Sequence, residues 1–218
     1  MEPGTVRAAH LGLKEHLLRG FAYCVVHLVH RPRLYGTLPK LDEPTIFVCR
    51  HVGLMDPVVL MVEYARYMLH PLVANDYYNK NGFTRFFYKM AFCIPIERHK
   101  ASRQWIEDSM AVLGKGEHVI IFPEGTRNKN ADKSELGEFR EGSLKIAQRT
   151  GCPVVPVAIS GTADIYENHR PFVRRAHVTV RFLEPFRIAE LEGEHRKKPA
   201  AYTRGLIMDQ LKKSSENR

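Results

Sequence analysis

The sequence predicts an α/β protein with a mostly parallel central sheet flanked by helices and an N-terminal amphipathic helical arm. Three observations lead to this fold class. Short β-rich apolar runs alternate with helical patterns from residue 45 onward, as in proteins built from βαβ units. The chain has 218 residues, enough for one well-buried domain but not for two full ones. Its 44% hydrophobic and 26% charged residues are ordinary for a folded protein, so we expect an arm over residues 1–40 and a single domain over residues 41–218.

The arm is both basic and apolar, because six Lys and Arg outnumber two acids within it. Apolar residues recur at spacings of three and four, which predicts one or two amphipathic helices that end near Arg31-Pro32. These apolar residues are Leu11, Leu13, Leu17, Leu18, Phe21, Val25, Leu28 and Val29. Such a helix either lies in a membrane interface, with its cations near anionic headgroups, or packs on the core. The most apolar run, Phe21–Val29, is about half the roughly 20 residues that span a bilayer, and we expect no secretory signal.

The expected elements of the domain follow in order. Short runs rich in β-branched residues predict strands, and apolar residues at a helical period predict helices. The expected strands cover residues 45–49, 94–96, 118–122, 154–160 and 177–182. The expected helices cover residues 57–69, 101–113, 142–150 and 200–213. In such a sheet the functional loops follow the carboxyl ends of the strands.

The charge of the chain indicates an anionic partner. Lys and Arg number 33 against 24 acids, a net charge of +9 with His neutral. Nucleic acid, an anionic membrane surface and phosphorylated substrates all fit this charge. The four cysteines form no CxxC pair, which argues against a zinc site or a disulfide framework and favours buried thiols in a reducing, cytosol-facing compartment, although a single disulfide is still compatible with them.

A possible base and its partner follow the strand expected at residues 45–49. His51 and Asp56 form an H-x4-D pattern. A spacing of five places two side chains about 140° apart on a straight helix, so they pair only if a turn lies between them, and Gly53 can supply that turn. A neutral His that donates one ring N–H to a carboxylate presents its other nitrogen as an oriented base. The alternative is a chance pair without function.

A second constellation, Phe122–Asn128, follows the strand expected at residues 118–122. Gly125 allows a close backbone approach, Thr126 supplies a hydroxyl, and Arg127 offers planar donors suited to a phosphate or carboxylate. This pattern predicts an anion-binding loop. An ion pair between Glu124 and Arg127 that closes an ordinary turn is the alternative.

Two further segments and an aromatic stretch stand out. Cys93–His99 contains Arg98, either a phosphate ligand or the solvated end of a strand. Pro156 lies in the proline-flanked strand of Gly151–Ile159, where it either shapes a pocket wall or frames the strand. Residues 76–92 combine aromatic and basic side chains, which suit either a membrane surface or a helix in the core.

In this order, the four segments resemble the motif blocks of the glycerolipid acyltransferases, the lysophosphatidic acid and glycerol-3-phosphate acyltransferase family. The resemblance covers residues 45–165, and F-P-E-G-T-R is its most specific part. It implies a glycerol-3-phosphate acyltransferase-like fold, with residues 41–218 as the catalytic domain. His51 would act as the base and Asp56 as the carboxylate that orients it. The residues implied to bind the acceptor's phosphate or organise its pocket are Arg98, Glu124, Gly125, Thr126 and Arg127, and Pro156 would shape the donor side.

The resemblance implies acylation of lysophosphatidic acid to phosphatidic acid at the cytoplasmic face of a membrane, by a peripheral or monotopic protein. Acyl-ACP or acyl-CoA would be the co-substrate, with no other cofactor, no metal and no nucleic acid partner. Glycerol-3-phosphate or another lysolipid, such as lyso-ornithine lipid, is an alternative acceptor. The chain lacks a G-x-S-x-G nucleophile elbow, which fits direct transfer without a covalent enzyme intermediate.

Two residues depart from the family pattern, which usually has Asn or Ser before the His and often Ser two residues after it. Here these positions hold Arg50 and Gly53. Arg50 would bind part of a substrate, disfavour protonation of His51, or point to solvent. These departures are also the support for a different function, a non-catalytic protein that binds anionic lipid.

Overall fold

A seven-stranded sheet forms the centre of the computed structural model, which describes residues 12–30, 32–36, 40–97, 103–127, 136–165 and 175–216. The strand order is β1-β7-β6-β2-β5-β3-β4. Every neighbouring pair is parallel except β6 and β7. The strands are β1 (Arg33–Tyr35), β2 (Ile46–Cys49), β3 (Leu69–Ala74), β4 (Ile94–Ile96), β5 (His118–Ile121), β6 (Val154–Ser160) and β7 (Thr179–Phe182). The predicted α/β class with a mostly parallel sheet is confirmed.

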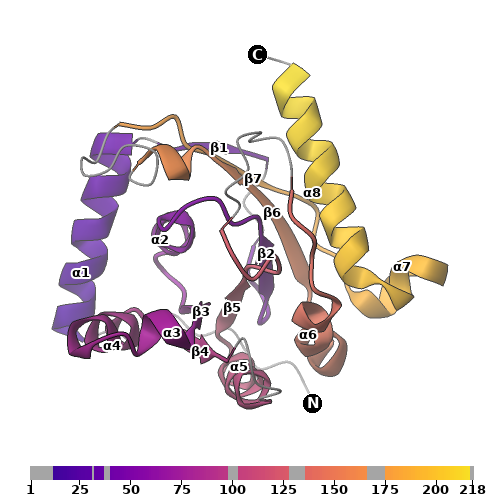
Figure 1. Ribbon diagram of the computed structural model, residues 1–218, viewed down its shortest axis with the longest axis horizontal. Coiled ribbons are helices and arrows are strands. Elements are labelled where there is room, and N and C mark those ends of the chain that lie inside the picture. Colours follow the sequence, from indigo (N-terminus) through magenta and orange to yellow (C-terminus); the bar gives the residue numbers. More distant parts are fainter. Residues whose placement is uncertain are drawn as a thin grey trace.

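Helices cover both faces of this sheet (Figure 1). The α-helices are α1 (Leu13–Cys24), α2 (Asp56–Glu63), α3 (Asn75–Tyr78), α4 (Gly82–Met90), α5 (Gln104–Gly114), α6 (Lys145–Thr150), α7 (Gly193–Lys197) and α8 (Pro199–Glu216). Shorter turns are the π-helix η1 (Val25–His30) and the 3₁₀ helices η2 (Glu141–Leu144), η3 (Thr162–Asp164) and η5 (Ile188–Glu190). In Figure 1, α1 and α2 lie on one side of the sheet, and α6 and α8 on the other.

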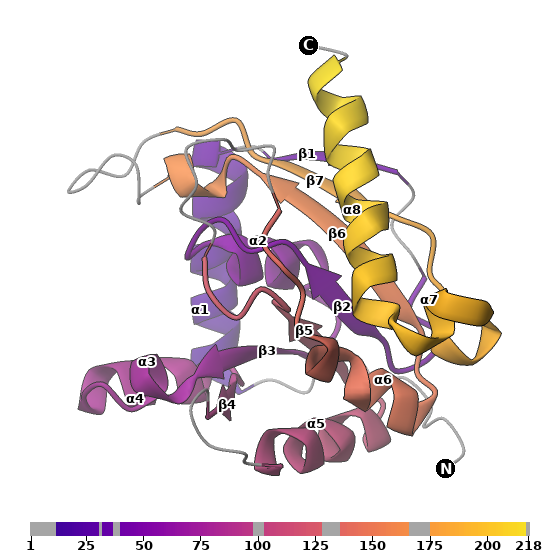
Figure 2. The ribbon, with the colours of Figure 1, turned by 45° about the vertical axis from the view of Figure 1, so that its right-hand side comes forward.

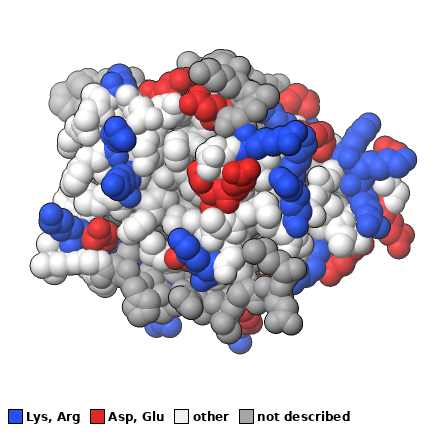
Figure 3. Space-filling model, turned by 90° about the horizontal axis from the view of Figure 1, so that it is seen from below, with Lys and Arg blue, Asp and Glu red and all other residues white. Residues whose placement is uncertain are grey.

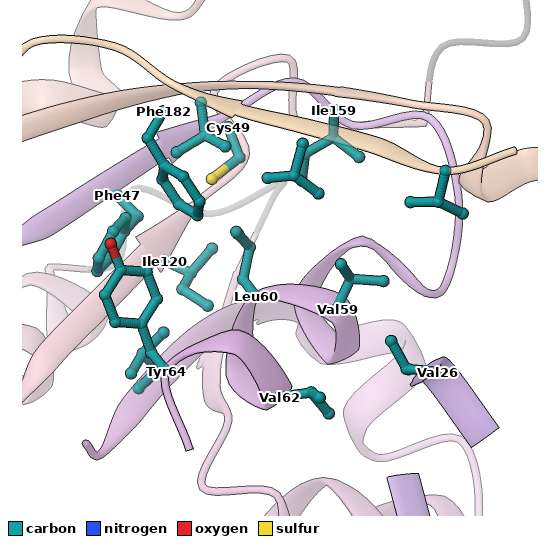
Figure 4. Packing of buried hydrophobic residues seen from close by; sticks show 14 of the residues in the cluster. Val26, Phe47, Cys49, Val59, Leu60, Val62, Tyr64, Ile120, Ile159 and Phe182 are labelled. Carbon is teal, nitrogen blue, oxygen red and sulfur yellow. The ribbon is translucent and has the colours of Figure 1, made fainter. Parts of the chain in front are cut away.

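Alternate residues of the central strands face two separate hydrophobic cores. In β2, Phe47 and Cys49 pack with α2 and η1, whereas Ile46 and Val48 pack with α5, α6 and α8. This is the two-residue period of a strand, and burial on both faces is what parallel sheets require. Figure 4 shows the first core, where side chains of α2 lie between the sheet and Val26 of η1.

The sequence prediction missed two strands. β3 begins at Leu69, so the helix expected over residues 57–69 is too long and ends at Glu63. β1 lies at the edge of the sheet and within residues 1–40, where it pairs with β7 from Arg33↔Thr179 onward. The helical part of the arm therefore ends before β1.

α1, all of whose residues are described, buries none of them. Its large apolar residues are exposed, among them Leu13, Leu17 and Phe21. Cys24 is exposed as well, so the expectation of a buried thiol is wrong at that position. Arg19 attaches α1 to the segment after α2, because its Nη1 donates hydrogen bonds of 3.1 Å to the carbonyls of Ala65 and Tyr67.

Candidate active site

The loop that follows β2 brings His51 and Asp56 together. Asp56 is the first residue of α2, and its backbone N–H donates to the Gly53 carbonyl at 3.2 Å, which closes a turn between the two side chains. His51 Nδ1 lies 2.8 Å from Asp56 Oδ2. The H-x4-D pair thus has the turn that its spacing requires. His51 remains 21% exposed and its ring packs on Phe122, with centroids 4.3 Å apart.

Asp56 is fully buried and held by several donors. Its Oδ2 accepts hydrogen bonds from the backbone N–H groups of Val52 at 2.7 Å and Gly53 at 2.9 Å. Its Oδ1 accepts one from the Thr162 hydroxyl. Because a carboxylate only accepts, His51 Nδ1 must carry the hydrogen that it shares with Asp56, and Nε2 keeps a free lone pair. The arrangement presents Nε2 as an oriented base.

Gly53 is required by a close backbone contact. A Cβ at this position would lie 2.8 Å from the backbone of Thr162 and of Ala163, which is closer than non-bonded atoms approach. The same approach places the Thr162 hydroxyl on Asp56. The departure from the family pattern at Gly53 therefore has a structural cause.

Glu124 connects its own loop, which follows β5, to the loop of His51, which follows β2. It is 7% exposed, and its Oε1 accepts a hydrogen bond of 2.8 Å from the backbone N–H of His51. Its Oε2 accepts one of 3.0 Å from the backbone N–H of Gly137. Burial raises the pKa of the Glu124 carboxyl, while these two donors and the charge of Arg50 lower it. Glu124 is thus placed to hold His51 in position rather than to face a ligand.

Arg50 lies in the interior, only 2% exposed. The interpretation that it points to solvent is therefore wrong. Its backbone N–H donates to the Val157 carbonyl of β6 at 3.2 Å, and its charge favours the ionised form of Glu124. Arg50 acts on the same buried carboxylate that holds His51.

A cavity of about 930 Å³ opens beside His51. One part of its wall is apolar and is built by α2, β3, β4, α4 and the end of β5. The residues of this part include Met55, Val58, Met61, Leu72, Val73, Phe87, Cys93 and Phe122. A concave, mostly apolar space with few polar groups is typical of sites for small organic ligands.

The other part of the cavity wall is cationic. Arg103, Arg127, Arg140, Lys145 and Arg149 line it, together with Gly125, Thr126 and Glu97. Gly125 has a φ of +68°, and a Cβ there would lie 2.9 Å from the guanidinium carbon of Arg140. The glycine of F-P-E-G-T-R therefore makes room for Arg140. The guanidinium of Arg127 lies over the Tyr77 ring, 5.9 Å from its centroid.

The structure brings most of the predicted residues together. His51, Gly125, Thr126 and Arg127 line the cavity, with Asp56 and Glu124 directly behind His51. Pro156 is not among the described residues that line it, and it lies buried in β6 opposite Val48. Arg98 lies outside the described residues.

Sequence reasoning missed Thr162 and Arg140. Thr162 follows β6, the strand beside β2. Its hydroxyl could therefore be placed near Asp56 only once the strand order was known. Lys145 and Arg149 are four residues apart, a helical spacing that signals a shared face, whereas Arg140 precedes η2 and carries no such signal. Over the described part of the chain, no three His, Cys, Asp or Glu side chains group as a metal site, and no described helix is long and apolar enough to cross a bilayer.

Comparison with known proteins identifies the class of protein that this fold and site define. Residues 27–160 match the model of the Acyltransferase family, and the chain belongs to that family. Among similar proteins, a chloroplastic 1-acyl-sn-glycerol-3-phosphate acyltransferase of Brassica napus is 31% identical over 130 residues, 59% of this chain and 36% of its own. The 1-acyl-sn-glycerol-3-phosphate acyltransferase of Bacillus subtilis is 30% identical over 120 residues, 55% of this chain and 57% of its own.

The chain thus spans little more than a third to somewhat over half of these curated relatives. A solved structure shares its fold. The 1-acyl-sn-glycerophosphate (LPA) acyltransferase PlsC from Thermotoga maritima superimposes with a TM-score of 0.73 at 20% identity, over 92% of this chain and 79% of PlsC.

Proposed function

We propose that this protein transfers a fatty-acyl group from an acyl thioester to the free hydroxyl of lysophosphatidic acid, which gives phosphatidic acid. The observation that carries the proposal is the His51–Asp56 pair, 2.8 Å apart, at the wall of a largely apolar cavity. The relatives that match the chain bear the name 1-acyl-sn-glycerol-3-phosphate acyltransferase, which favours lysophosphatidic acid over the other acceptors.

The proposed reaction needs one base and no covalent enzyme intermediate. His51 Nε2 takes the proton of the acceptor hydroxyl while its oxygen attacks the thioester carbonyl carbon. The new C–O bond forms, the tetrahedral intermediate collapses, and the C–S bond breaks. The imidazolium then returns the proton to the leaving thiolate. Asp56 keeps the ring in one tautomer and stabilises its protonated form.

The two parts of the cavity wall fit the two ends of the substrates. Fatty-acyl chains suit the apolar part around α2, β3 and β4, because burial of methylene groups is favourable there. The acceptor's phosphate suits Arg127 and Arg140, which line the cavity near the loop that touches His51. Guanidinium groups bind phosphate oxygens through paired, charge-assisted hydrogen bonds.

The proposed site of action is a membrane surface, to which the protein would bind peripherally at the cytoplasmic face. α4, described throughout, buries none of its residues, so the alternative of an aromatic helix in the core does not apply. Phe83 is 76% and Phe86 58% exposed. The side that carries α1 and α4 shows mostly uncharged atoms, with scattered basic groups and some acidic atoms among them (Figure 3). Exposed apolar area of this extent is typical of an interaction surface.

The alternative of a non-catalytic lipid-binding protein has lost its support. It depended on Arg50 and Gly53, and both now have structural explanations that leave the His51–Asp56 pair intact. Glycerol-3-phosphate and lyso-ornithine lipid would use the same base, so they enter as acceptors in the test.

The test is acyl transfer by purified protein from labelled acyl-CoA and acyl-ACP to each acceptor. We expect phosphatidic acid from wild type, and a loss of about 10²–10⁴-fold in kcat for His51→Ala, the usual contribution of a general base. Asp56→Asn should lose activity as well, because an amide disturbs the tautomer of His51. His195→Ala, at an exposed histidine of α7, should leave activity unchanged. Absence of acylated product with every donor and acceptor would rule out the enzyme.

A further inference from the structure

We propose that Arg103, Lys145 and Arg149, the α5–α6 cationic cluster, bind the phosphate of the phosphopantetheine arm that carries the acyl group. This inference rests on the proposed function and extends it to the donor. Coenzyme A and acyl carrier protein share this arm, so the ligand chemistry is a phosphate monoester or diester joined to a long thiol chain.

The cluster belongs to the same cavity as His51 but to different elements from the motif loops. Arg103 immediately precedes α5, Lys145 begins α6, and Arg149 lies in its last turn. α5 and α6 contact each other, and Figure 2 shows them side by side below the sheet. All three side chains line the cavity wall. The fold therefore places three cations from two helices on the wall of one cavity.

These cations are not neutralised by the described part of the chain. Within it, none of the three side chains forms an ion pair or a hydrogen bond with a described residue, and all three are exposed. Arg103 also lies at the N-terminal end of an 11-residue helix, where the helix dipole disfavours positive charge. Like charges placed together at an electrostatic cost are explained by an anion that binds among them.

The position of α6, which carries Lys145 and Arg149, favours the donor's phosphate over the acceptor's. His51 follows the carboxyl end of β2. By contrast, α6 is followed within a few residues by the amino end of β6, which pairs with β2 in parallel. β2 has four residues, so its two ends are roughly 10 Å apart. Arg149 thus lies toward the strand end opposite His51. In lysophosphatidic acid only a few atoms separate the phosphate from the reacting hydroxyl, while the pantetheine arm holds its phosphate far from the thioester.

The test compares two donors that differ only in this phosphate, acyl-phosphopantetheine and acyl-pantetheine. For the double variant Lys145→Gln/Arg149→Gln we expect KM for acyl-phosphopantetheine to rise at least tenfold. KM for acyl-pantetheine and for lysophosphatidic acid should stay within twofold, with kcat preserved. The matched control is Lys115→Gln, an exposed lysine just after α5 that is not among the described residues lining the cavity; it should behave as wild type.

Three results would overturn the assignment. An equal rise in KM for both donors would show that the phosphate is not what the cluster binds. A rise in KM for lysophosphatidic acid would assign the cluster to the acceptor. A rise in KM for acyl-CoA but not for acyl-ACP would assign the cluster to the nucleotide instead. Equal rises in KM for these two natural donors support binding of the phosphate that they share.

Direct binding separates this inference from the proposed function. Calorimetric titration of wild type and the double variant with phosphopantetheine and with pantetheine needs no turnover. Tighter binding of phosphopantetheine that the double variant loses supports the cluster even if wild type acylates no acceptor, in which case only the proposed function fails. Normal acylation with no difference between the two proteins in these titrations would overturn the cluster alone.

Discussion

The carboxylate of Glu124 accepts a hydrogen bond of 2.8 Å from the backbone N–H of His51, so a residue of the second motif fixes the position of His51. Its other oxygen accepts from Gly137 at 3.0 Å, which ties the segment before η2 to the same point. The segments around His51, Glu124 and Gly137 therefore meet at one buried carboxylate. This contact explains why F-P-E-G-T-R and H-x4-D belong together physically.

Replacement of Glu124 by Gln should impair both stability and turnover. A Gln amide has one acceptor oxygen, and its NH₂ group would face a backbone N–H, so one of the two hydrogen bonds is lost. We expect the free energy of unfolding to fall by about 1–3 kcal/mol, measured by urea denaturation, and kcat to fall more than KM rises. The control is Glu138→Gln, next to Gly137 in the segment before η2, where the side chain is 93% exposed. Unchanged kcat in Glu124→Gln would contradict a positioning role.

Gly53→Ser introduces the residue that the family often has two positions after the His, and here it should be harmful. The new Cβ would lie 2.8 Å from the backbone of Thr162 and Ala163, so that segment must move away from Asp56. We expect a loss of about 1–3 kcal/mol in stability and a lower kcat. Gly205→Ala in α8, where a Cβ meets no described atom within 4 Å, should instead stabilise by up to about 1 kcal/mol. Equal melting temperatures for both variants would speak against the close contact.

The fold was predictable where each element carries its own pattern. The buried runs of β2, β5 and β6 and the helical period of α8 are visible in the sequence alone. β1 was missed because its three residues are held by pairing with β7, from Arg33↔Thr179 onward, and such distant pairing leaves no local signal. In β3, His70 and Pro71 interrupt the apolar run, and the preceding helical pattern masked the change of period.

The site was likewise predictable where its residues form a local sequence pattern, and not where they depend on contacts between distant segments. His51, Asp56 and the loop Glu124–Arg127 were found because each motif is contiguous. Thr162 was missed because its contact with Asp56 depends on the adjacency of β2 and β6. Arg140 was missed because its place depends on the space that Gly125 leaves. Both are consequences of tertiary structure.

His118 should make stability depend on pH. The side chain is fully buried, and its Nδ1 accepts a hydrogen bond of 3.1 Å from the backbone N–H of Thr45, so the ring is neutral. Burial, with a smaller effect of the nearby His70, lowers the pKa of His118 to about 4, whereas an unfolded His titrates near 6.5. Between these two pKa values the unfolded state binds more protons than the folded state. The contribution of His118 to stability is therefore complete above pH 6.5 and is lost as pH falls toward 4.

We expect this loss to reach about 3 kcal/mol at pH 4, from the cost of roughly 1.4 kcal/mol per pKa unit. His118→Asn keeps an acceptor for Thr45 but cannot titrate. Urea denaturation from pH 4 to pH 8 should therefore show a smaller loss toward acid for the variant than for wild type, while other groups change both proteins alike. Parallel curves would show that His118 is not the titrating group.

Arg127→Ala should weaken acylation of a phosphorylated acceptor more than of an uncharged one. Arg127 lines the cavity and lies over the Tyr77 ring, where its guanidinium can meet a phosphate. Loss of a desolvated charged partner costs about 2 kcal/mol or more, so kcat/KM for lysophosphatidic acid should fall at least about thirtyfold. Monoacylglycerol should lose much less. Arg66→Ala, at an exposed arginine outside the described cavity lining, is the control, and equal losses with both acceptors would count against phosphate binding.

The double variant Phe83→Ser/Phe86→Ser tests the membrane surface without disturbing the sheet. Deletion of residues 1–40 would also remove β1, which pairs with β7, whereas these two side chains are exposed on α4. Full burial of one Phe contributes about 1.5–3 kcal/mol, so even partial insertion of both predicts at least about tenfold weaker sedimentation with anionic liposomes. Tyr35→Ser, at an exposed aromatic of β1, should bind as wild type. Undiminished liposome binding by the double variant, with an unchanged melting temperature, would exclude α4 from the membrane contact and leave α1 as the surface to test.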